Sequence, residues 1–180
     1  MTGHCINNRM IKLNNKPHSR SYTKPYKWDG SALSHAAWKN GIANWVVQLN
    51  PQYATTLRLN VPYPCTDDMA DRFLNKFFYI LNRALNLAIY GRRLLRRTQK
   101  NGLAVWFTGE LLNTSPHFHG IIRTPVPVYG LDQFVDSVWK SVIKSGDTKT
   151  KMIYEAKGWA DYCTKHADRS SYYYCSYVSR

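Results

Sequence analysis

The run Pro-His-Phe-His-Gly at residues 116–120, which leads into an apolar pair, constrains the fold more than any other stretch. Its composition is that of a strand, and side chains alternate along a strand, so His117 and His119 point to one face. Phe118 then points to the opposite face, where a core would lie. Two neutral imidazoles on one face supply half of a metal site. A strand can also expose two histidines by chance, so the pair gains meaning only from residues near it.

A β-hairpin is predicted around this strand. Residues 103–110 have the pattern of a second strand, and the loop after it returns the chain into the histidine strand. If Glu110 lies opposite His117, its carboxylate lies on the histidine face. Glu110 is therefore predicted to complete a metal site with the two histidines, and His166 is the competing third ligand. The alternative is that Glu110 is an ordinary acid at the edge of a loop.

The order of the predicted elements indicates the fold class. Strands and helices alternate around the central hairpin, which predicts an α+β domain with a central antiparallel sheet and helices packed on it. We expect residues 1–50 to form a basic N-terminal extension with one helix at 31–49, and residues 51–180 to form the main domain. In that domain we expect strands at 53–60 and around 152–154, helices at 66–91, 131–144 and 158–167, and a tyrosine-rich tail that forms a last strand or an ordered arm.

The charge of the chain limits the classes of partner that it is expected to bind. The net charge is +14 and the sequence pI is about 9.8. A domain this basic is typically matched to a polyanion, and nucleic acid is the first candidate. A membrane surface is the competing polyanion, but the basic residues are scattered and no apolar run is long enough to span a bilayer. Residues 1–20 are polar and lack the apolar centre of a signal peptide, so we expect a cytoplasmic location and no membrane partner.

Two groups of side chains are predicted to contact DNA. The first follows the helix predicted at 66–91, where five positive charges occur within nine residues. The second lies on the outward face of the strand at 53–60. In both groups the alternative is an ordinary solvated surface. The predicted contacts are Arg92, Arg93, Arg96 and Arg97 in the first group, and Arg58 and Asn60 in the second.

Three stretches occur in order along the chain: Ala-Thr-Thr-Leu-Arg-Leu-Asn at 54–60, His-Phe-His at 117–119 and Tyr-Cys-Thr-Lys at 162–165. Together they resemble the three motifs of the HUH endonucleases, and within that superfamily those of the rolling-circle replication initiators. The third stretch resembles the form seen in initiators of small circular single-stranded DNA viruses. The resemblance covers roughly residues 52–168.

The resemblance implies a fold with the histidines on central strands and the tyrosine helix above them. It implies that Tyr162 attacks a DNA phosphodiester and that Lys165 supplies a positive charge to the phenolate or to the phosphate. An acid one strand before the histidines is similar to the family's third ligand, and the implied cofactor is Mn²⁺ or Mg²⁺. The implied products are a 5′-phosphotyrosine link and a free 3′ hydroxyl, which permits later rejoining. The expected function is site-specific nicking of single-stranded DNA to initiate rolling-circle replication.

The resemblance also implies binding partners, and it leaves several alternative functions open. The expected ligand is single-stranded or hairpin origin DNA of a plasmid or virus. No Gly-x-x-x-x-Gly-Lys-[Ser/Thr] loop occurs in the sequence, so we expect a host helicase and polymerase to act with it. Relaxases and HUH transposases share the histidine pair and are alternatives within the superfamily. Outside it, two histidines and a carboxylate are also the ligands of non-haem iron oxygenases. The last alternative is a non-catalytic domain that binds single strands through its tyrosines.

Overall fold

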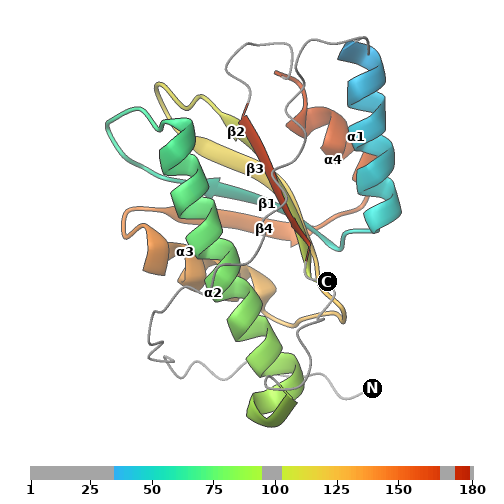
Figure 1. Cartoon of the computed structure of the whole chain (residues 1–180), viewed down its shortest axis with the longest axis vertical. Helices are drawn as coiled ribbons and strands as arrows, with labels where there is room; N and C mark the ends of the chain where they lie inside the picture. The colour runs from blue at the N-terminus through green and yellow to red at the C-terminus, as the bar shows by residue number, and fades with distance from the viewer. Residues whose placement is uncertain (1–34, 95–102, 167–172, 179–180) are drawn as a thin grey trace.

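The computed structural model describes residues 35–94, 103–166 and 173–178. These residues form four helices and one sheet of five antiparallel strands in the order β4-β1-β3-β2-β5 (Figure 1). The predicted α+β class and central antiparallel sheet are therefore confirmed. The strands are β1 (Tyr53–Arg58), β2 (Ala104–Glu110), β3 (His117–Arg123), β4 (Asp147–Met152) and β5 (Tyr173–Val178), and the helices are α1 (His35–Leu49), α2 (Asp67–Leu94), α3 (Leu131–Val142) and α4 (Ala156–Cys163).

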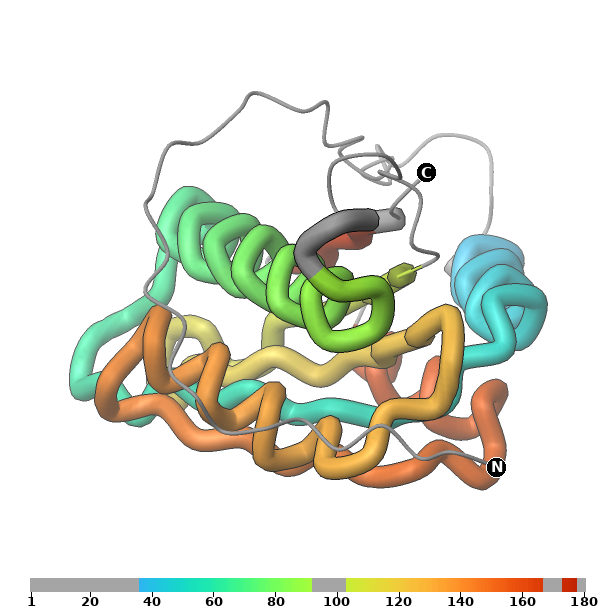
Figure 2. Tube along the Cα trace, turned by 90° about the horizontal axis from the view of Figure 1, so that it is seen from below, coloured from blue at the N-terminus to red at the C-terminus, as the bar shows by residue number. Residues whose placement is uncertain are grey.

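The sheet separates two layers of helices. Helices α2 and α3 lie on one side of it, and α1 and α4 lie together on the other (Figure 2). Because side chains alternate along a strand, consecutive residues of β3 serve different layers. Phe118 is fully buried in the core beneath α2 and α3, whereas Ile121 belongs to a smaller apolar cluster beneath α1 and α4. His119 lies on the face of Ile121, one residue away from the main core.

Helix α2 begins and breaks where the sequence predicts. The hydroxyl of Thr66 accepts a hydrogen bond from the backbone N–H of Met69 at 3.3 Å, and Asp67 and Asp68 place negative charge in the first turn. Gly91 has φ of 70°, a conformation that favours glycine because it has no Cβ, and it interrupts the helix. Only three residues of the assigned helix follow this kink.

The shorter helices differ from their predicted bounds by a few residues. Helix α3 ends at residue 142 because Ile143 is extended, with φ of −133° and ψ of 110°. Helix α4 begins two residues earlier than predicted. The side chain of Glu155 caps it by accepting hydrogen bonds from the backbone N–H groups of Lys157 and Gly158. In the described part of the chain, no helix combines the length and the apolar character needed to cross a membrane.

Strand β4 lies further upstream than the strand predicted around residues 152–154, and that prediction is corrected. Its sequence, Asp-Thr-Lys-Thr-Lys-Met, lacks an apolar alternation because β4 is an edge strand that covers little core. On one face Thr148 and Thr150 bond through their hydroxyls to α3 and β1. The other face carries Lys149 and Lys151, which are both exposed.

Helix α1 packs against α4 and so shares a core with the sheet. Ala43 and Val46 of α1 are buried in the same cluster as Trp106 of β2 and Ala160 of α4. The expected boundary at residue 50 therefore falls between two segments that share this cluster. The rest of the expected N-terminal extension, residues 1–34, lies outside the described residues.

Candidate metal centre

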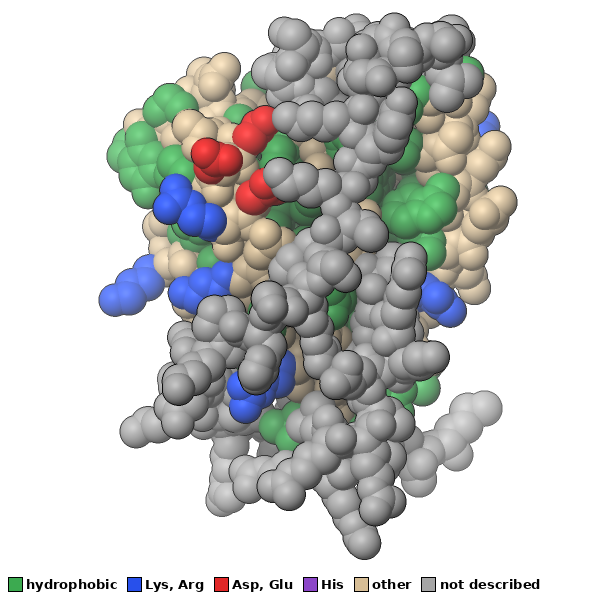
Figure 3. Space-filling view, viewed as in Figure 1, with side chains coloured by type: hydrophobic (Ala, Val, Ile, Leu, Met, Phe, Trp, Pro, Cys, Tyr) green, Lys and Arg blue, Asp and Glu red, His purple; other side chains and the backbone are tan. Residues whose placement is uncertain are grey.

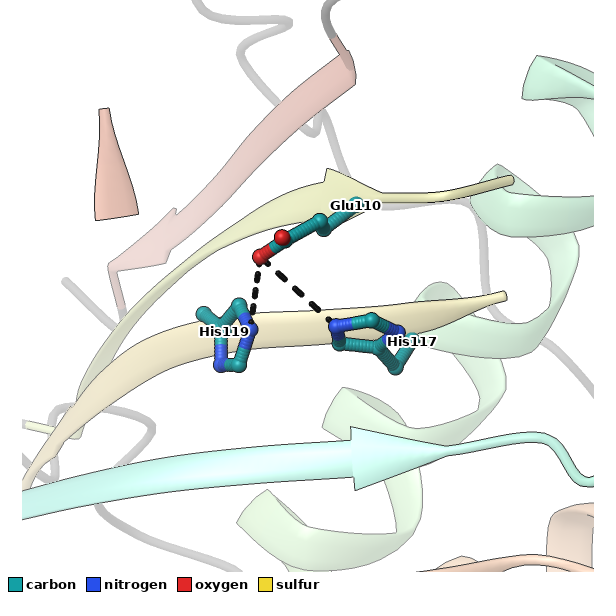
Figure 4. A group of neighbouring side chains, drawn as sticks. All are labelled: Glu110, His117 and His119. Carbon is teal, nitrogen blue, oxygen red and sulfur yellow. Dashed lines mark ion pairs between the residues drawn. The ribbon is translucent and has the colours of Figure 1, made fainter. Parts of the chain in front are cut away.

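The three predicted ligands come together on the face of the sheet that carries α4. In the pairing of β2 with β3, Glu110 lies opposite His117 and Thr108 lies opposite His119, which confirms the predicted register of the hairpin. One ligand atom from each of Glu110, His117 and His119 lies within 4.8 Å of the others. Figure 4 shows the carboxylate of Glu110 reaching from β2 toward both imidazoles on β3.

Hydrogen bonds behind the two rings determine which nitrogen faces the carboxylate. Nδ1 of His117 lies 2.7 Å from the carbonyl oxygen of Ser115, and a carbonyl can only accept, so Nδ1 carries the proton. In the neutral ring Nε2 is then bare, and it faces Glu110 at 3.6 Å. Nδ1 of His119 bonds to the hydroxyl of Thr56 at 3.0 Å, which leaves Nε2 facing Glu110 here as well. Outer hydrogen bonds of this kind orient metal-binding imidazoles.

His119 has a buried nitrogen beside Glu110. Its Nε2 lies 2.9 Å from Oε2 of Glu110 and has no other hydrogen-bond partner. Burial, together with the nearby His117, lowers the pKa of His119 to about 4 in spite of the opposing charge of Glu110. The ring is therefore neutral at pH 7. A buried imidazole nitrogen beside a carboxylate oxygen places two ligand atoms of the kind that bind divalent cations next to each other.

Glu110 is contacted on both of its oxygens. Oε2 faces the two histidines of the hairpin, whereas Oε1 lies 2.9 Å from Nζ of Lys165 and 3.3 Å from Nε2 of His166. Burial raises the pKa of Glu110, but the hydrogen bond and charge of Lys165, with the two histidines, outweigh it and lower the pKa. The carboxylate is therefore ionised at neutral pH. His166 reaches only its far oxygen and is not part of the group of three.

The donor set fits a divalent cation. Two imidazole nitrogens and one carboxylate oxygen are common ligands of divalent transition metals, and a carboxylate also suits Mg²⁺ and Mn²⁺. The side chains of Glu110, His117 and His119 are 13%, 17% and 8% exposed, so the group is sheltered but lies within reach of solvent. Three protein ligands leave coordination positions open for a substrate.

Helix α4 and the turn that follows it bring Tyr162 and Lys165 to the edge of the same group. The ring of Tyr162 packs edge-on to His119 with 5.1 Å between ring centroids, and 42% of the residue is exposed. Nζ of Lys165 lies 4.0 Å from the centre of the Tyr162 ring while it pairs with Glu110. Burial lowers the pKa of Lys165, but its hydrogen bonds to Glu110 and Tyr162 outweigh it and raise the pKa. Lys165 is therefore a cation that contacts both the predicted nucleophile and a predicted metal ligand.

Trp159 attaches the tyrosine helix to the histidine strand. Its Nε1 donates a hydrogen bond to the carbonyl oxygen of Gly120 at 2.8 Å. Its indole stacks on Tyr162 with 5.1 Å between centroids and 17° between planes. The hydroxyl of Thr108 adds a second attachment by donating to the carbonyl oxygen of Cys163 at 3.0 Å. Position 120 requires glycine, because a Cβ there would overlap the backbone of β2.

The residues that were predicted to contact DNA have different environments in the structure. Arg58 lies opposite His117 and so on the site face; its side chain is 57% exposed and its Nη1 lies 3.9 Å from Asp147. The amide of Asn60 donates to Asp147 at 2.8 Å and to the carbonyl oxygen of Ser145 at 3.0 Å, so it stabilises the turn before β4. The predicted contacts whose side chains lie outside the described residues are Arg92, Arg93, Arg96 and Arg97.

The residues that hold the ligands in place were missed by sequence reasoning. Thr56 lies on the outward face of the strand predicted at 53–60, but threonine is common in any strand. Ser115 acts through its backbone carbonyl, which no side-chain pattern reports. Trp159 was not singled out, although its ring stacks on Tyr162. The pairing of β1 with β3 brings Thr56 to His119, and the packing of α4 on β3 brings Trp159 to the carbonyl of Gly120.

Comparison of this chain with models of protein families, with curated proteins and with solved structures finds no match. What the candidate site does must therefore be argued from its own residues and from the sequence motifs.

Proposed function

We propose that this protein is a metal-dependent, site-specific single-stranded DNA endonuclease and strand transferase of the HUH type that initiates rolling-circle replication. The observation that carries the proposal is the position of Tyr162. Its ring packs on His119, a member of the candidate metal group, and contacts Lys165. The order of the three sequence motifs and the central position of the histidine strand support the same function.

Glu110, His117 and His119 would hold one Mn²⁺ or Mg²⁺. When bound, such a cation polarises an oxygen of the phosphodiester and makes its phosphorus more open to attack. The chain itself aligns the two imidazoles, through the bonds of His117 to Ser115 and of His119 to Thr56, and burial keeps His119 neutral. It also keeps the carboxylate ionised, through Lys165.

Tyr162 would be the nucleophile. Its phenolic oxygen forms a bond to phosphorus while the bond from phosphorus to the 3′ oxygen of the preceding nucleotide breaks. The tyrosine loses its proton and the departing 3′ oxygen gains one, which gives a 5′-phosphotyrosine and a free 3′ hydroxyl. The ammonium of Lys165 stabilises the negative charge that develops on the phenolic oxygen. Because one phosphodiester is exchanged for another, a 3′ hydroxyl can later reverse the step.

Two further observations support DNA as the substrate. The chain has a net charge of +14, which favours a polyanion. Arg58 adds an exposed positive charge on the site face, opposite His117. The choice of a replication initiator over a relaxase or a transposase rests on the third motif, Tyr-Cys-Thr-Lys at 162–165.

The test is formation of a covalent adduct. The protein is incubated with Mn²⁺ and a pool of random single-stranded oligonucleotides labelled at the 3′ end, and the products are separated on a denaturing gel. We expect labelled DNA to migrate with the wild-type protein, because the fragment downstream of the nick stays on the tyrosine. Tyr162→Phe should abolish this band and retain DNA binding, since only the attacking oxygen is removed.

Tyr154→Phe and Tyr129→Phe are the matched controls, because both tyrosines are exposed and lie outside the metal group. Both variants should form the adduct at the wild-type level. An adduct that survives Tyr162→Phe, or that is lost in Tyr154→Phe, would contradict the assignment of the nucleophile. Binding of the oligonucleotide pool without any adduct would favour the non-catalytic binding domain instead.

A further inference from the structure

Strand β4 carries two exposed lysines on the face that holds the candidate metal group. Lys149 lies opposite Thr56 of β1, and Thr56 lies opposite His119 of β3. Opposed residues of antiparallel strands point to one face, and the hydrogen bond between Thr56 and His119 agrees with this. Because neighbouring strands are about 4.8 Å apart, the backbone of Lys149 lies about 10 Å from that of His119. Lys151 lies on the same face, two residues further along β4.

These two lysines are not neutralised in the part of the chain that the structure describes. Asp147, on the same strand, contacts Arg58 and Asn60 instead. The ion pairs formed among the described residues do not include Lys149 or Lys151, and both residues are exposed. Positive charge that is exposed beside a phosphate-handling site attracts a polyanion to that side.

The edge of the site beside α2 carries acidic side chains, and Glu110 there is paired with Lys165. A cavity of about 370 Å³ lies beside Glu110, and its lining includes Asp67 at the start of α2. Acidic side chains gather around the start of α2 (Figure 3), where Asp67 and Asp68 occupy the first turn. A chain of phosphates is repelled from this end and attracted to β4. The charge distribution therefore favours one path across the sheet.

We propose that β4 is the track of the DNA strand beside the scissile phosphate, with Lys149 and Lys151 bound to two phosphates on one side of the phosphate at His119. The inference rests on the proposed function for the identity of the ligand. The two lysines are alternate residues of one strand, so they lie about 6.8 Å apart. That spacing lets each amine meet a different phosphate of one extended single strand.

Lysines on an edge strand also have a purely structural use. They discourage the exposed edge from pairing with the sheet of another molecule. That use requires positive charge on the edge but no contact with DNA, and its loss produces self-association. The two roles therefore predict different measurements.

The test compares two double variants of the full chain with the same loss of charge. Lys149→Gln/Lys151→Gln removes the proposed track, and Lys76→Gln/Lys144→Gln removes two exposed lysines outside β4, one on α2 and one in the turn after α3. Affinity for a labelled oligothymidylate is measured by fluorescence anisotropy over a range of salt concentrations, with EDTA present so that no cleavage occurs. Circular dichroism and gel filtration monitor folding and self-association.

We expect the β4 variant to bind several-fold more weakly than wild type. The slope of log affinity against log salt should fall by about 1.4, because each lost phosphate contact removes about 0.7. The control variant should keep a slope closer to that of wild type. Two results would overturn the proposal. One is an equal slope for the two variants, and the other is self-association of the β4 variant without loss of affinity for DNA.

The same variants separate this inference from the proposed function. If wild type forms the covalent adduct and the β4 variant binds DNA normally, the track is wrong and the nuclease stands. If no adduct forms under any condition and the β4 variant alone loses affinity, the track stands and the nuclease is wrong.

Discussion

The two faces of the sheet use the same strands for different purposes. On the side of α2 and α3, alternate residues of the central strands enter one large apolar core, in which Phe118 packs edge-on to Trp139 and Tyr173. On the side of α1 and α4 the apolar cluster is smaller, and beside it lie Glu110 and His119 with their hydrogen-bonded partners. Adjacent residues of β3 therefore have different roles: Phe118 belongs to the apolar core and His119 to the candidate metal group.

The difference shows how each layer is held. The larger layer depends on buried apolar area, which is non-directional and tolerates changes of detail. Helix α4 on the other layer has only eight residues, and it is tied to the sheet by directed bonds from Trp159 and Thr108. We therefore expect substitutions on the first face to change the free energy of unfolding, and substitutions on the second face to change chemistry at a smaller cost in stability.

The largest expected effect is that of Phe118→Ala. Phe118 is fully buried, so its truncation should lower the free energy of unfolding by about 3–5 kcal/mol. The neighbouring His119→Gln, on the other face, should cost about 1 kcal/mol, the worth of one hydrogen bond. Urea denaturation of both variants in EDTA measures the difference. Similar losses for the two would show that the faces are not divided as described.

The next effect is a loss of stability in acid. The pKa of His119 is lowered to about 4 in the folded chain, and an unfolded histidine titrates near 6.5. Below pH 6.5 the unfolded state therefore takes up a proton that the folded state refuses until about pH 4, so falling pH favours unfolding. The metal-free protein should lose about 1–2 kcal/mol between pH 7 and pH 5 through this residue.

His119→Gln supplies the control for the acid profile, because glutamine does not titrate. Urea denaturation at pH 7 and at pH 5 should show a smaller loss for this variant than for wild type. An unchanged loss would assign the acid sensitivity to other groups and would contradict the neutral, buried state of the ring.

The two faces also differ in how much of them the sequence predicts. The alternation of side chains along a strand predicted that His117 and His119 point to one face and Phe118 to the other. The predicted hairpin placed Glu110 beside the histidines. The candidate ligands therefore followed from local rules. The apolar stripe and the glycine break of α2 were predictable for the same reason. These features depend on neighbours in sequence.

Features that depend on distant contacts were not predictable. The strand was predicted around residues 152–154, too far downstream, because the threonines and lysines of β4 show no apolar alternation. Only the position of β4 at the edge of the sheet explains that composition. The hydrogen bond from Trp159 to the carbonyl oxygen of Gly120 depends on how α4 packs against β3. The pairing of β5 with β2 likewise joins segments far apart in the chain.

The smallest expected effect is that of Trp159→Phe. Phenylalanine keeps an aromatic ring against Tyr162 but cannot donate to the carbonyl of Gly120, so the free energy of unfolding should fall by about 1 kcal/mol. Because α4 carries Tyr162, the rate of adduct formation should fall more than the affinity for DNA. Trp45→Phe is the control, since Trp45 packs in the same cluster but on α1. Equal changes in rate for both variants would remove the special role of Trp159.

The central claim is that Glu110, His117 and His119 form one metal site, with His166 outside it. Its most direct test is Mn²⁺ binding followed by electron paramagnetic resonance, which requires no DNA and no turnover. Wild type and His166→Ala should each bind one Mn²⁺ per chain with similar affinity. Glu110→Ala, which removes a ligand and its charge, should bind at least about tenfold more weakly. A wild-type protein that binds no Mn²⁺, or a loss of binding in His166→Ala but not in Glu110→Ala, would contradict the claim.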